Sequence, residues 1–286
     1  MVLLGAIFKC LDPILILAAI ESSRNFFLQP PGTAQRNLEI RSGMALGQPS
    51  DHLALLNAFR EWRFIKANRG RAAASDYAHD NLMHHGGLAT IEKTSEQMLE
   101  MLVNWGLAKD IPPEHRYNNE LGDPELNINS DVQPLIFSLL AAGLMPNLAV
   151  QVNPVLLQTS SDPKALIHPN SLNSNAGEVK SDKKSRYLGA GPPGTLVLFS
   201  SKSAAGGGVF LRETSVIGPM TGLMFSGKLS PGDDEKRVLN IDDWLPCKFE
   251  SGVAPNVLEL TKCIDNVSTI FRVWLSFSSS IVLGRG

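Results

Sequence analysis

Apolar positions in the first half of the chain recur every three or four residues, a spacing typical of helices with one buried face. The pattern predicts helices over residues 13–21, 51–62, 76–83, 88–105 and 134–142. Asp12, Ser50 and either Ser130 or Asp131 precede three of these helices, and such residues commonly cap helix N-termini. Because each apolar face must be covered, we expect this half to form a helical bundle.

The second half has a different pattern, in which short apolar runs alternate with clusters of Gly, Pro, Ser and Asn. Strands are expected over residues 148–152, 195–200, 209–213, 222–225 and 238–244. Their length and spacing suit a small β-barrel. A last helix is expected from about 255 to 274, where apolar side chains share one face. The predicted fold class is therefore α+β, with a helical bundle over residues 1–147 and a small barrel with a C-terminal helix over residues 148–286.

The apolar start of the chain has two readings, a targeting segment or a buried helix. Lys9, Asp12 and Pro13 interrupt it, and its longest clean apolar run, 14–20, is much shorter than the roughly 20 residues that a membrane span needs. A buried helix fits better, and we expect no membrane partner. Three cysteines without a C-x-x-C pair favour a reducing compartment, so we expect an intracellular protein, nuclear or cytoplasmic.

Charge gives no whole-chain argument for nucleic acid, because the net charge is only -2. Residues 1–150 hold 12 Lys and Arg against 16 Asp and Glu, whereas residues 151–286 hold 14 against 12. Any bound nucleic acid must therefore meet local clusters of cations. One such cluster, Lys180, Lys183, Lys184 and Arg186, lies in a polar segment between expected strands.

Motifs for catalysis or metal binding are weak. Residues 222–229 fit the start of a phosphate-binding loop, but Leu229 stands where a Mg²⁺-binding Ser or Thr belongs. We therefore expect an ordinary strand and turn there. His79, His84 and His85 lie near two aspartates without the spacing of a metal site, which favours solvated or capping histidines. The sequence predicts no catalytic residue, no metal and no cofactor in this chain.

Basic residues offer better candidates for contact with RNA. Arg60, Arg63 and Lys66 would share one flank of a helix, where they could follow a phosphate backbone or simply face solvent. Lys202 lies just beyond the expected strand 195–200 and Arg212 lies within the expected strand 209–213, both close to aromatic residues. Barrels of the OB type place cations and rings on such a face, although phenylalanines there more often belong to the core.

Five segments carry motifs in a fixed order along the chain. They are L-G-A-I-F-K-C-L-D-P-I-L at 4–15, S-D-H-L-A-L-L-N at 50–57, I-H-P-N-S-L-N at 167–173, V-F-L-R-E-T at 209–214 and D-D-W at 242–244. Together they resemble the region that follows the motor in DExH/DEAH-box RNA helicases. The resemblance implies a helical ratchet (helicase-associated) domain over residues 1–147, with most of the preceding winged helix missing, and an OB-fold over 148–286.

The resemblance also implies an RNA channel and candidate residues for it. Carried over by position, these are Ser50, Asp51, His168, Ser171, Lys202 and Arg212. Each has a plainer alternative. The first two could only cap a helix, the next two could only shape a turn, Lys202 could be solvated, and Arg212 could pair with a carboxylate such as Asp242.

The expected function is that of an RNA-binding accessory region of an ATP-dependent RNA helicase, without motor domains in this chain. Its expected partners are single-stranded RNA and the helicase motor domains. An activator protein is a further partner if the chain serves as a docking module. ATP and Mg²⁺ are expected only for the full-length helicase. The alternatives are an activator-docking module for protein interaction and a non-functional helicase fragment.

Overall fold

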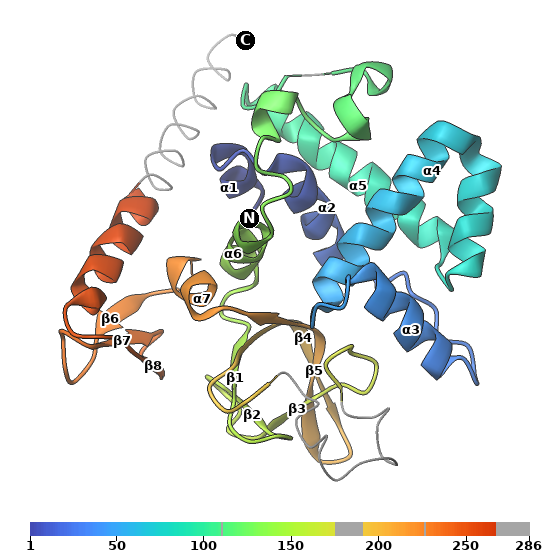
Figure 1. The fold of residues 1–286 in the computed structure, drawn as a ribbon. Coiled ribbons are helices and arrows are strands. Elements are labelled where there is room, and N and C mark those ends of the chain that lie inside the picture. Colours follow the sequence, from blue (N-terminus) through green and yellow to red (C-terminus); the bar gives the residue numbers. More distant parts are fainter. Residues whose placement is uncertain (110, 175–190, 226, 267–286) are drawn as a thin grey trace, which may run out of the picture.

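The computed structural model describes residues 1–109, 111–174, 191–225 and 227–266. Helices form the upper and right-hand parts of the molecule, a closed barrel lies below them, and a small sheet with the last helix stands to one side (Figure 1). The helices of the first half are α1 (Val2–Ile7), α2 (Leu11–Glu21), α3 (Ala34–Met44), α4 (Asp51–Asp80), α5 (His85–Asn104) and α6 (Gln133–Leu144). Three short 3-10 helices follow α5, at η1 (Pro113–His115), η2 (Tyr117–Asn119) and η3 (Pro124–Leu126).

The second half contains a five-stranded barrel of the OB type and a smaller sheet. The barrel closes in the order β1-β2-β3-β5-β4, and β3 and β5 run parallel. Its strands are β1 (Leu148–Gln151), β2 (Leu157–Thr159), β3 (Ala165–Ile167), β4 (Leu196–Ala205) and β5 (Gly208–Ile217). After α7 (Pro219–Phe225) come β6 (Leu229–Pro231), β7 (Val238–Ile241) and β8 (Leu245–Lys248), which form an antiparallel sheet. A last helix begins at residue 253, and its described part reaches 266. The predicted fold class is confirmed.

One apolar core joins the helices to the barrel. Trp62 on α4 and Leu139 on α6 belong to the same buried cluster as Leu148 and Leu198 of the barrel. The interior of the barrel holds a separate cluster of six buried residues: Ala149, Leu157, Ala165, Val197, Phe199 and Leu211. Because the larger core crosses residues 147 and 148, the division into domains at that point stays a prediction. No helix among the described residues is both long enough and apolar enough to cross a membrane.

Two predicted strands were misplaced. Residues 222–225 lie in α7, where Pro219 occupies the first helical position and Gly222 packs closely against Leu196. Residues 238–241 do form a strand, β7, but it pairs with β6 and β8 outside the barrel. Short strands β2 and β3 close the barrel instead, and neither was predicted. The basic cluster 180–186 and the expected end of the last helix lie outside the described residues.

Helix boundaries also differ from the prediction. The predicted helix 76–83 is the later part of α4, which consists of two helical segments joined at Gly70, where the backbone is not helical (φ 87°, ψ 174°); the second segment ends at Asp80. Helix α6 begins after Val132, without a side-chain cap from Ser130 or Asp131. Helix α3 was missed, since its sequence has no apolar stripe.

Asp12 does not cap α2, whose N-cap position is Cys10 without a side-chain capping hydrogen bond; Asp12 instead lies fully buried between α2 and α4. Its Oδ1 accepts hydrogen bonds from Arg63 (2.7 Å) and the Leu121 amide (3.0 Å), and its Oδ2 accepts from Arg63 and Arg60. Burial alone would raise the pKa of Asp12, but the two arginines hold it below its usual value. The carboxylate therefore ties α2, α4 and the loop before Leu121 together.

We expect Asp12→Asn to lower the free energy of unfolding by about 3–5 kcal/mol at neutral pH, because it leaves buried arginine charge unpaired. Since the pKa of Asp12 is lower in the folded state, its contribution is present above the unfolded-state value of 3.8 and is lost as pH falls through the folded value. Urea unfolding from pH 7 downward measures both effects. Asp131→Asn, at a carboxylate that is 95% exposed, is the control and should change stability by less than about 1 kcal/mol. Equal effects of the two substitutions would contradict the assignment.

Candidate nucleic-acid interface

A second buried carboxylate, Asp51, lies where the first turn of α4 meets the barrel. Its Oδ1 accepts from Arg41 of α3 (2.5 Å) and the Leu172 amide (2.9 Å). Its Oδ2 accepts from the Ser171 hydroxyl (2.5 Å) and the Thr214 amide of β5 (2.8 Å). Four donors from three segments satisfy a side chain that is fully buried. Asp51 therefore fixes α3, the loop over 168–173 and β5 around the start of α4, an arrangement that we call the junction.

The neighbours of Asp51 in the sequence complete the junction. The Ser50 hydroxyl caps α4 by accepting from the Leu53 amide (3.0 Å), and it lies 2.6 Å from the Ser215 hydroxyl. His52 uses one ring nitrogen toward Ser215 (2.7 Å) and the other toward Ser200 and Glu21. Ser215 is completely buried, so this hydrogen-bonded chain of Ser, His and Glu has no access for a substrate.

Glu21 ends α2 and joins the same network. Burial acts to raise the pKa of Glu21, but hydrogen bonds from His52 and Ser200, together with the charge of His52, lower it below its ordinary value. The carboxylate is therefore ionised at neutral pH and holds the His52 ring between α2 and β4.

The loop over residues 168–173 turns back on itself beside β5. His168 Nδ1 accepts from the Asn170 amide (3.2 Å), and the His168 ring meets Phe210 edge to face at 6.2 Å. Burial, and then the charge of Arg212, lower the pKa of His168, so its ring is neutral at neutral pH. Asn173 donates to the Pro49 and Thr214 carbonyls, which holds the loop in place.

Two adjoining hollows open beside the junction and share Asn25, Arg212 and Glu213 in their walls. The smaller, of about 120 Å³, also reaches Arg41 and His168, and the larger, of about 390 Å³, also reaches Arg24. We call these two neighbouring hollows, between the end of α2, α3, the 168–173 loop and the β4–β5 ribbon, the junction groove.

Three arginines and three carboxylates line the junction groove, and the carboxylates are engaged by neighbouring side chains. Asp51 has its four donors, Glu21 contacts His52 and Ser200, and Glu213 accepts from Asn25. Arg212 donates through Nε to Ser203 (3.1 Å) and has no carboxylate within ion-pair distance among the described residues. Asp242, the expected alternative partner, instead accepts from the Lys228 amide. Arg41 Nε is buried and also lacks a hydrogen-bond partner in the described part of the chain. Phe27 lies beneath the Arg41 guanidinium at 5.5 Å.

Lys202 and Arg212 do not lie together. In the β4–β5 ladder, Lys202 is opposite Leu211 and Arg212 is opposite Ser201, so the two charged side chains point to opposite faces of the ribbon. Lys202 bonds to Asp162 (2.6 Å) and lies 5.5 Å from the Phe199 ring. Phe199 itself is a core residue, which agrees with the expectation that phenylalanines in such barrels more often belong to the core.

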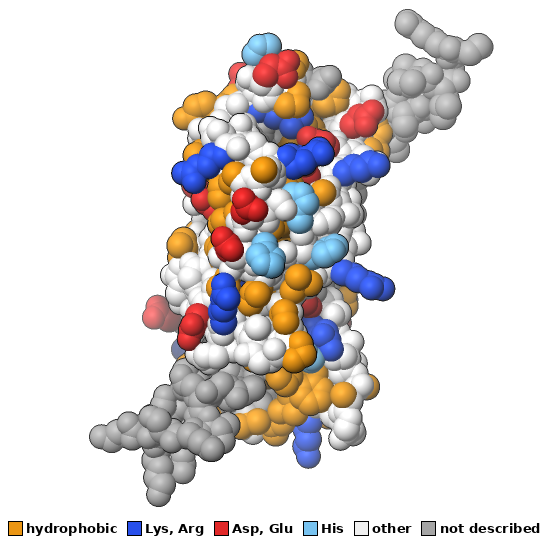
Figure 2. All heavy atoms as spheres, turned by 90° about the vertical axis from the view of Figure 1, so that its right-hand side faces the viewer, with side chains coloured by type: hydrophobic (Ala, Val, Ile, Leu, Met, Phe, Trp, Pro, Cys, Tyr) orange, Lys and Arg blue, Asp and Glu red, His pale blue; other side chains and the backbone are white. Residues whose placement is uncertain are grey.

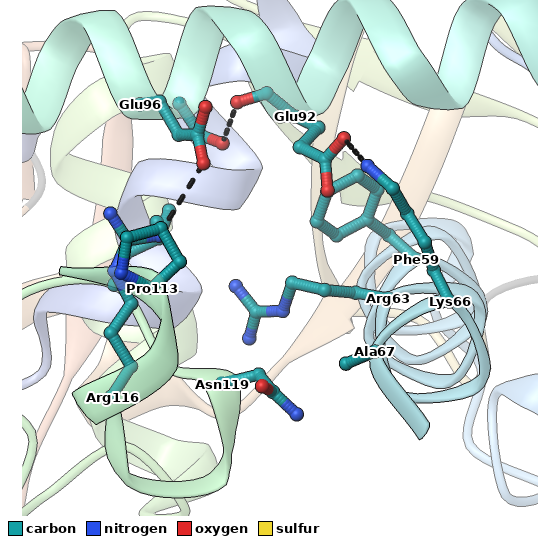
Figure 3. Close-up of a pocket in the computed structure, with 11 residues that line it drawn as sticks. Phe59, Arg63, Lys66, Ala67, Glu92, Glu96, Pro113, Arg116 and Asn119 are labelled. Atoms are coloured by element: carbon teal, nitrogen blue, oxygen red, sulfur yellow. Dashed lines mark hydrogen bonds and ion pairs between the residues drawn. The ribbon is translucent and has the colours of Figure 1, made fainter. Parts of the chain in front are cut away.

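The basic flank of α4 lies apart from the junction groove. Arg60 and Arg63 bond to Asp12, and Lys66 pairs with Glu92 of α5. Figure 3 shows Arg63 and Lys66 on one wall of a hollow of about 330 Å³ between α4, α5 and the 3-10 segments. These cations are already paired with carboxylates. They are therefore neither fully solvated nor a row of free cations for a phosphate backbone, the two alternatives that the sequence left open. The described residues contain no cluster of His, Cys, Asp and Glu able to hold a metal.

Parts of this chain are similar to a known domain family and to several RNA helicases. Residues 1–86 match the model of the helicase associated domain (HA2), ratchet-like. Bovine ATP-dependent DNA/RNA helicase DHX36 is 28% identical over 273 residues, covering 93% of this chain and 25% of that protein. Xenopus laevis ATP-dependent RNA helicase dhx29 is 28% identical over 279 residues, again covering 93% of this chain but 19% of the relative. Arabidopsis DExH-box ATP-dependent RNA helicase DExH3 is 23% identical over 270 residues, which are 93% of the chain and 20% of that protein.

Across 93% of its length, the chain is similar to part of each of these helicases. It spans about a quarter or less of the length of these relatives. In this helicase-related chain, three of the five motif segments meet at the junction, namely 50–57, 167–173 and 209–214. The polar residues of these segments form hydrogen bonds with one another, which explains why Ser50, Asp51 and Ser171 can be buried.

Several groove residues of the helicase-related chain escaped the sequence analysis. Arg24 and Asn25 follow α2 in an irregular segment, and Arg41 lies on the unpredicted helix α3. One signal was available: Asn37 and Arg41 are four residues apart and therefore share a helix face. Both are buried by polar contacts, which hydrophobic periodicity does not detect.

We expect Asp51→Asn to destabilise the chain by about 3–5 kcal/mol, because Arg41 would stay buried without its counter-charge. Hydrogen exchange should also accelerate at the Thr214 amide, which donates to Asp51. The measurements are urea unfolding and amide exchange. Asp162→Asn removes the partly exposed partner of Lys202 and is the control, with an expected change below about 1 kcal/mol. Unchanged protection of Thr214 in the Asp51 variant would show that the carboxylate does not hold β5.

Proposed function

We propose that the chain is the RNA-binding C-terminal part of an ATP-dependent RNA helicase and that single-stranded RNA lies in the junction groove. The observation that carries the proposal is the set of cations there. Arg24 and Arg212 line the groove and form no ion pair among the described residues. The carboxylates in the same walls, Glu21, Asp51 and Glu213, already accept hydrogen bonds from neighbouring groups. Arg41 is paired with Asp51, and its Nε is buried without a hydrogen-bond partner in the described part of the chain. Arginine is the side chain best suited to bidentate contact with phosphate.

The groove also offers groups for nucleobases. Phe27 lines it and is half-buried, and aromatic faces stack on bases with little regard to sequence. Neutral His168 can stack or exchange hydrogen bonds, while the Asn25 and Asn170 side chains present amide donors and acceptors. Backbone contact by arginine and base contact by rings and amides together suit an unpaired strand better than a duplex.

The remaining candidates take different roles in this proposal. Ser50, Asp51 and Ser171 position the walls of the groove without touching RNA. Lys202 lies on the other face of the β4–β5 ribbon, where it contacts the RNA strand only after that strand has left the groove. Arg60, Arg63 and Lys66 can reach phosphate only by giving up carboxylate partners, so they contribute least.

Unwinding requires an energy source, which the proposal assigns to motor domains of a longer protein. ATP and Mg²⁺ belong to that motor, and the motor domains are the first protein partner. The relatives' printed names, which include ATP-dependent RNA helicases, support this assignment.

We expect Arg212→Gln to weaken binding of fluorescein-labelled poly-uridylate by about threefold to tenfold, the range for one lost charged contact. The slope of log affinity against log salt should also fall in magnitude by about 0.7, the value for one phosphate on a single strand. Fluorescence anisotropy at several salt concentrations measures both quantities.

Lys248→Gln is the matched control, because Lys248 lies exposed on β8 outside the groove. It should leave affinity and salt slope almost unchanged. Lys202→Gln should give a smaller loss than Arg212→Gln. If all three variants bind like the unaltered chain, the groove is not the RNA site.

A further inference from the structure

A separate hollow of about 550 Å³ lies between the end of α3, the middle of α4 and residues 118–120. We call it the outer groove. It belongs neither to the junction groove nor to the hollow in Figure 3, although Arg63 borders both the outer groove and that hollow. Figure 2 shows the side of the molecule that carries α3 and α4, where apolar side chains lie among charges of both signs.

Two large apolar side chains at the outer groove are exposed. Leu46 is 73% exposed and Phe64 is 52% exposed, and both line the same hollow, with Met44 half-buried beside them. Leu46 also has a left-handed backbone (φ 54°), a conformation in which large apolar residues are uncommon. Single exposed apolar residues need no explanation, but two over one hollow form a potential anchor site for a ligand side chain.

Charge distinguishes the outer groove from the junction groove. Its two arginines, Arg60 and Arg63, are bonded to Asp12 beneath it. The carboxylates left on its rim are Glu61, Glu120 and Asp131, of which only Asp131 approaches an arginine, at 3.8 Å. Counting Asp12, four carboxylates face two guanidinium groups. The surface is therefore apolar with an excess of negative charge.

Glu120 shows this excess most clearly. It is half-buried and forms no ion pair in the described part of the chain. Burial, and then the neighbouring charge of Asp12, raise the pKa of Glu120. A cation placed beside Glu120 would relieve that repulsion.

We propose that the outer groove binds a peptide segment of a partner protein in which cationic and apolar side chains alternate. The apolar side chains contact Leu46 and Phe64, and the cations pair with Glu61 and Glu120. A phosphate backbone is a poor ligand here, because the unpaired charges on the rim are negative. This role goes beyond RNA binding and uses different residues.

The test uses the full chain and a fluorescein-labelled synthetic peptide of alternating leucine and lysine. Leu46→Asn with Phe64→Ser should weaken binding at least about tenfold, since truncated apolar anchors at an interface commonly account for that much. Asn tolerates the left-handed backbone at position 46, so the double variant should stay folded, as circular dichroism can verify. Glu61→Gln with Glu120→Gln should weaken binding by about the same factor.

Val155→Ser and Glu250→Gln are the matched controls, because both residues are exposed and lie away from the outer groove. Neither should change the affinity for the peptide. A peptide of alternating leucine and glutamate should not bind. The proposal is overturned if the groove variants bind the cationic peptide as tightly as the controls do.

Discussion

Everything that positions the junction groove depends on burying the Asp51 carboxylate with a complete set of donors. A buried carboxylate that loses a donor costs several kcal/mol, so α3, the 168–173 loop and β5 must reach it together. Because all three segments must contact the same carboxylate, the distance between the helices and the barrel is fixed. The positions of the groove walls therefore follow from satisfying one charge, and Arg212, whose only hydrogen bond among the described residues is through Nε to Ser203, keeps other donors for a ligand.

The two buried carboxylates hold three of the eight arginines in residues 1–147. Asp12 holds Arg60 and Arg63, and Asp51 holds part of Arg41. What remains on the surface differs from side to side. Among the described residues, the junction groove keeps two arginines, Arg24 and Arg212, that form no ion pair, whereas the outer groove keeps two carboxylates, Glu61 and Glu120, that form none. A chain with a net charge of only -2 can thus present two surfaces of opposite character, and whole-chain charge says nothing of either.

Periodicity predicted the helical half and the presence of a barrel because both rest on apolar faces, and residues such as Leu53, Phe59 and Trp62 are indeed buried. It failed for α3, which is held by polar contacts of Asn37 and Arg41. It also misplaced residues 222–225, since a short apolar run fits a strand or a helix equally well. Such choices depend on what packs against the segment.

The candidate residues show the same limit. Residue type and resemblance selected Ser50, Asp51, His168, Ser171 and Arg212, which the structure brings to one place. Pairing Lys202 with Arg212 failed because strand register, which places them on opposite faces, cannot be read from composition. Arg60 and Arg63 looked free because their partner, Asp12, is about 50 residues away in sequence and was interpreted as a cap.

Photo-crosslinking with 4-thiouridine-containing single-stranded RNA, followed by mass spectrometry of the adducts, tests the central claim most directly. The account predicts adducts in residues 24–29, 168–170 and 212–213, which come from three separate segments and meet only at the junction groove. Adducts confined to the outer groove, at residues 57–64 and 118–120, or to α5, would contradict it.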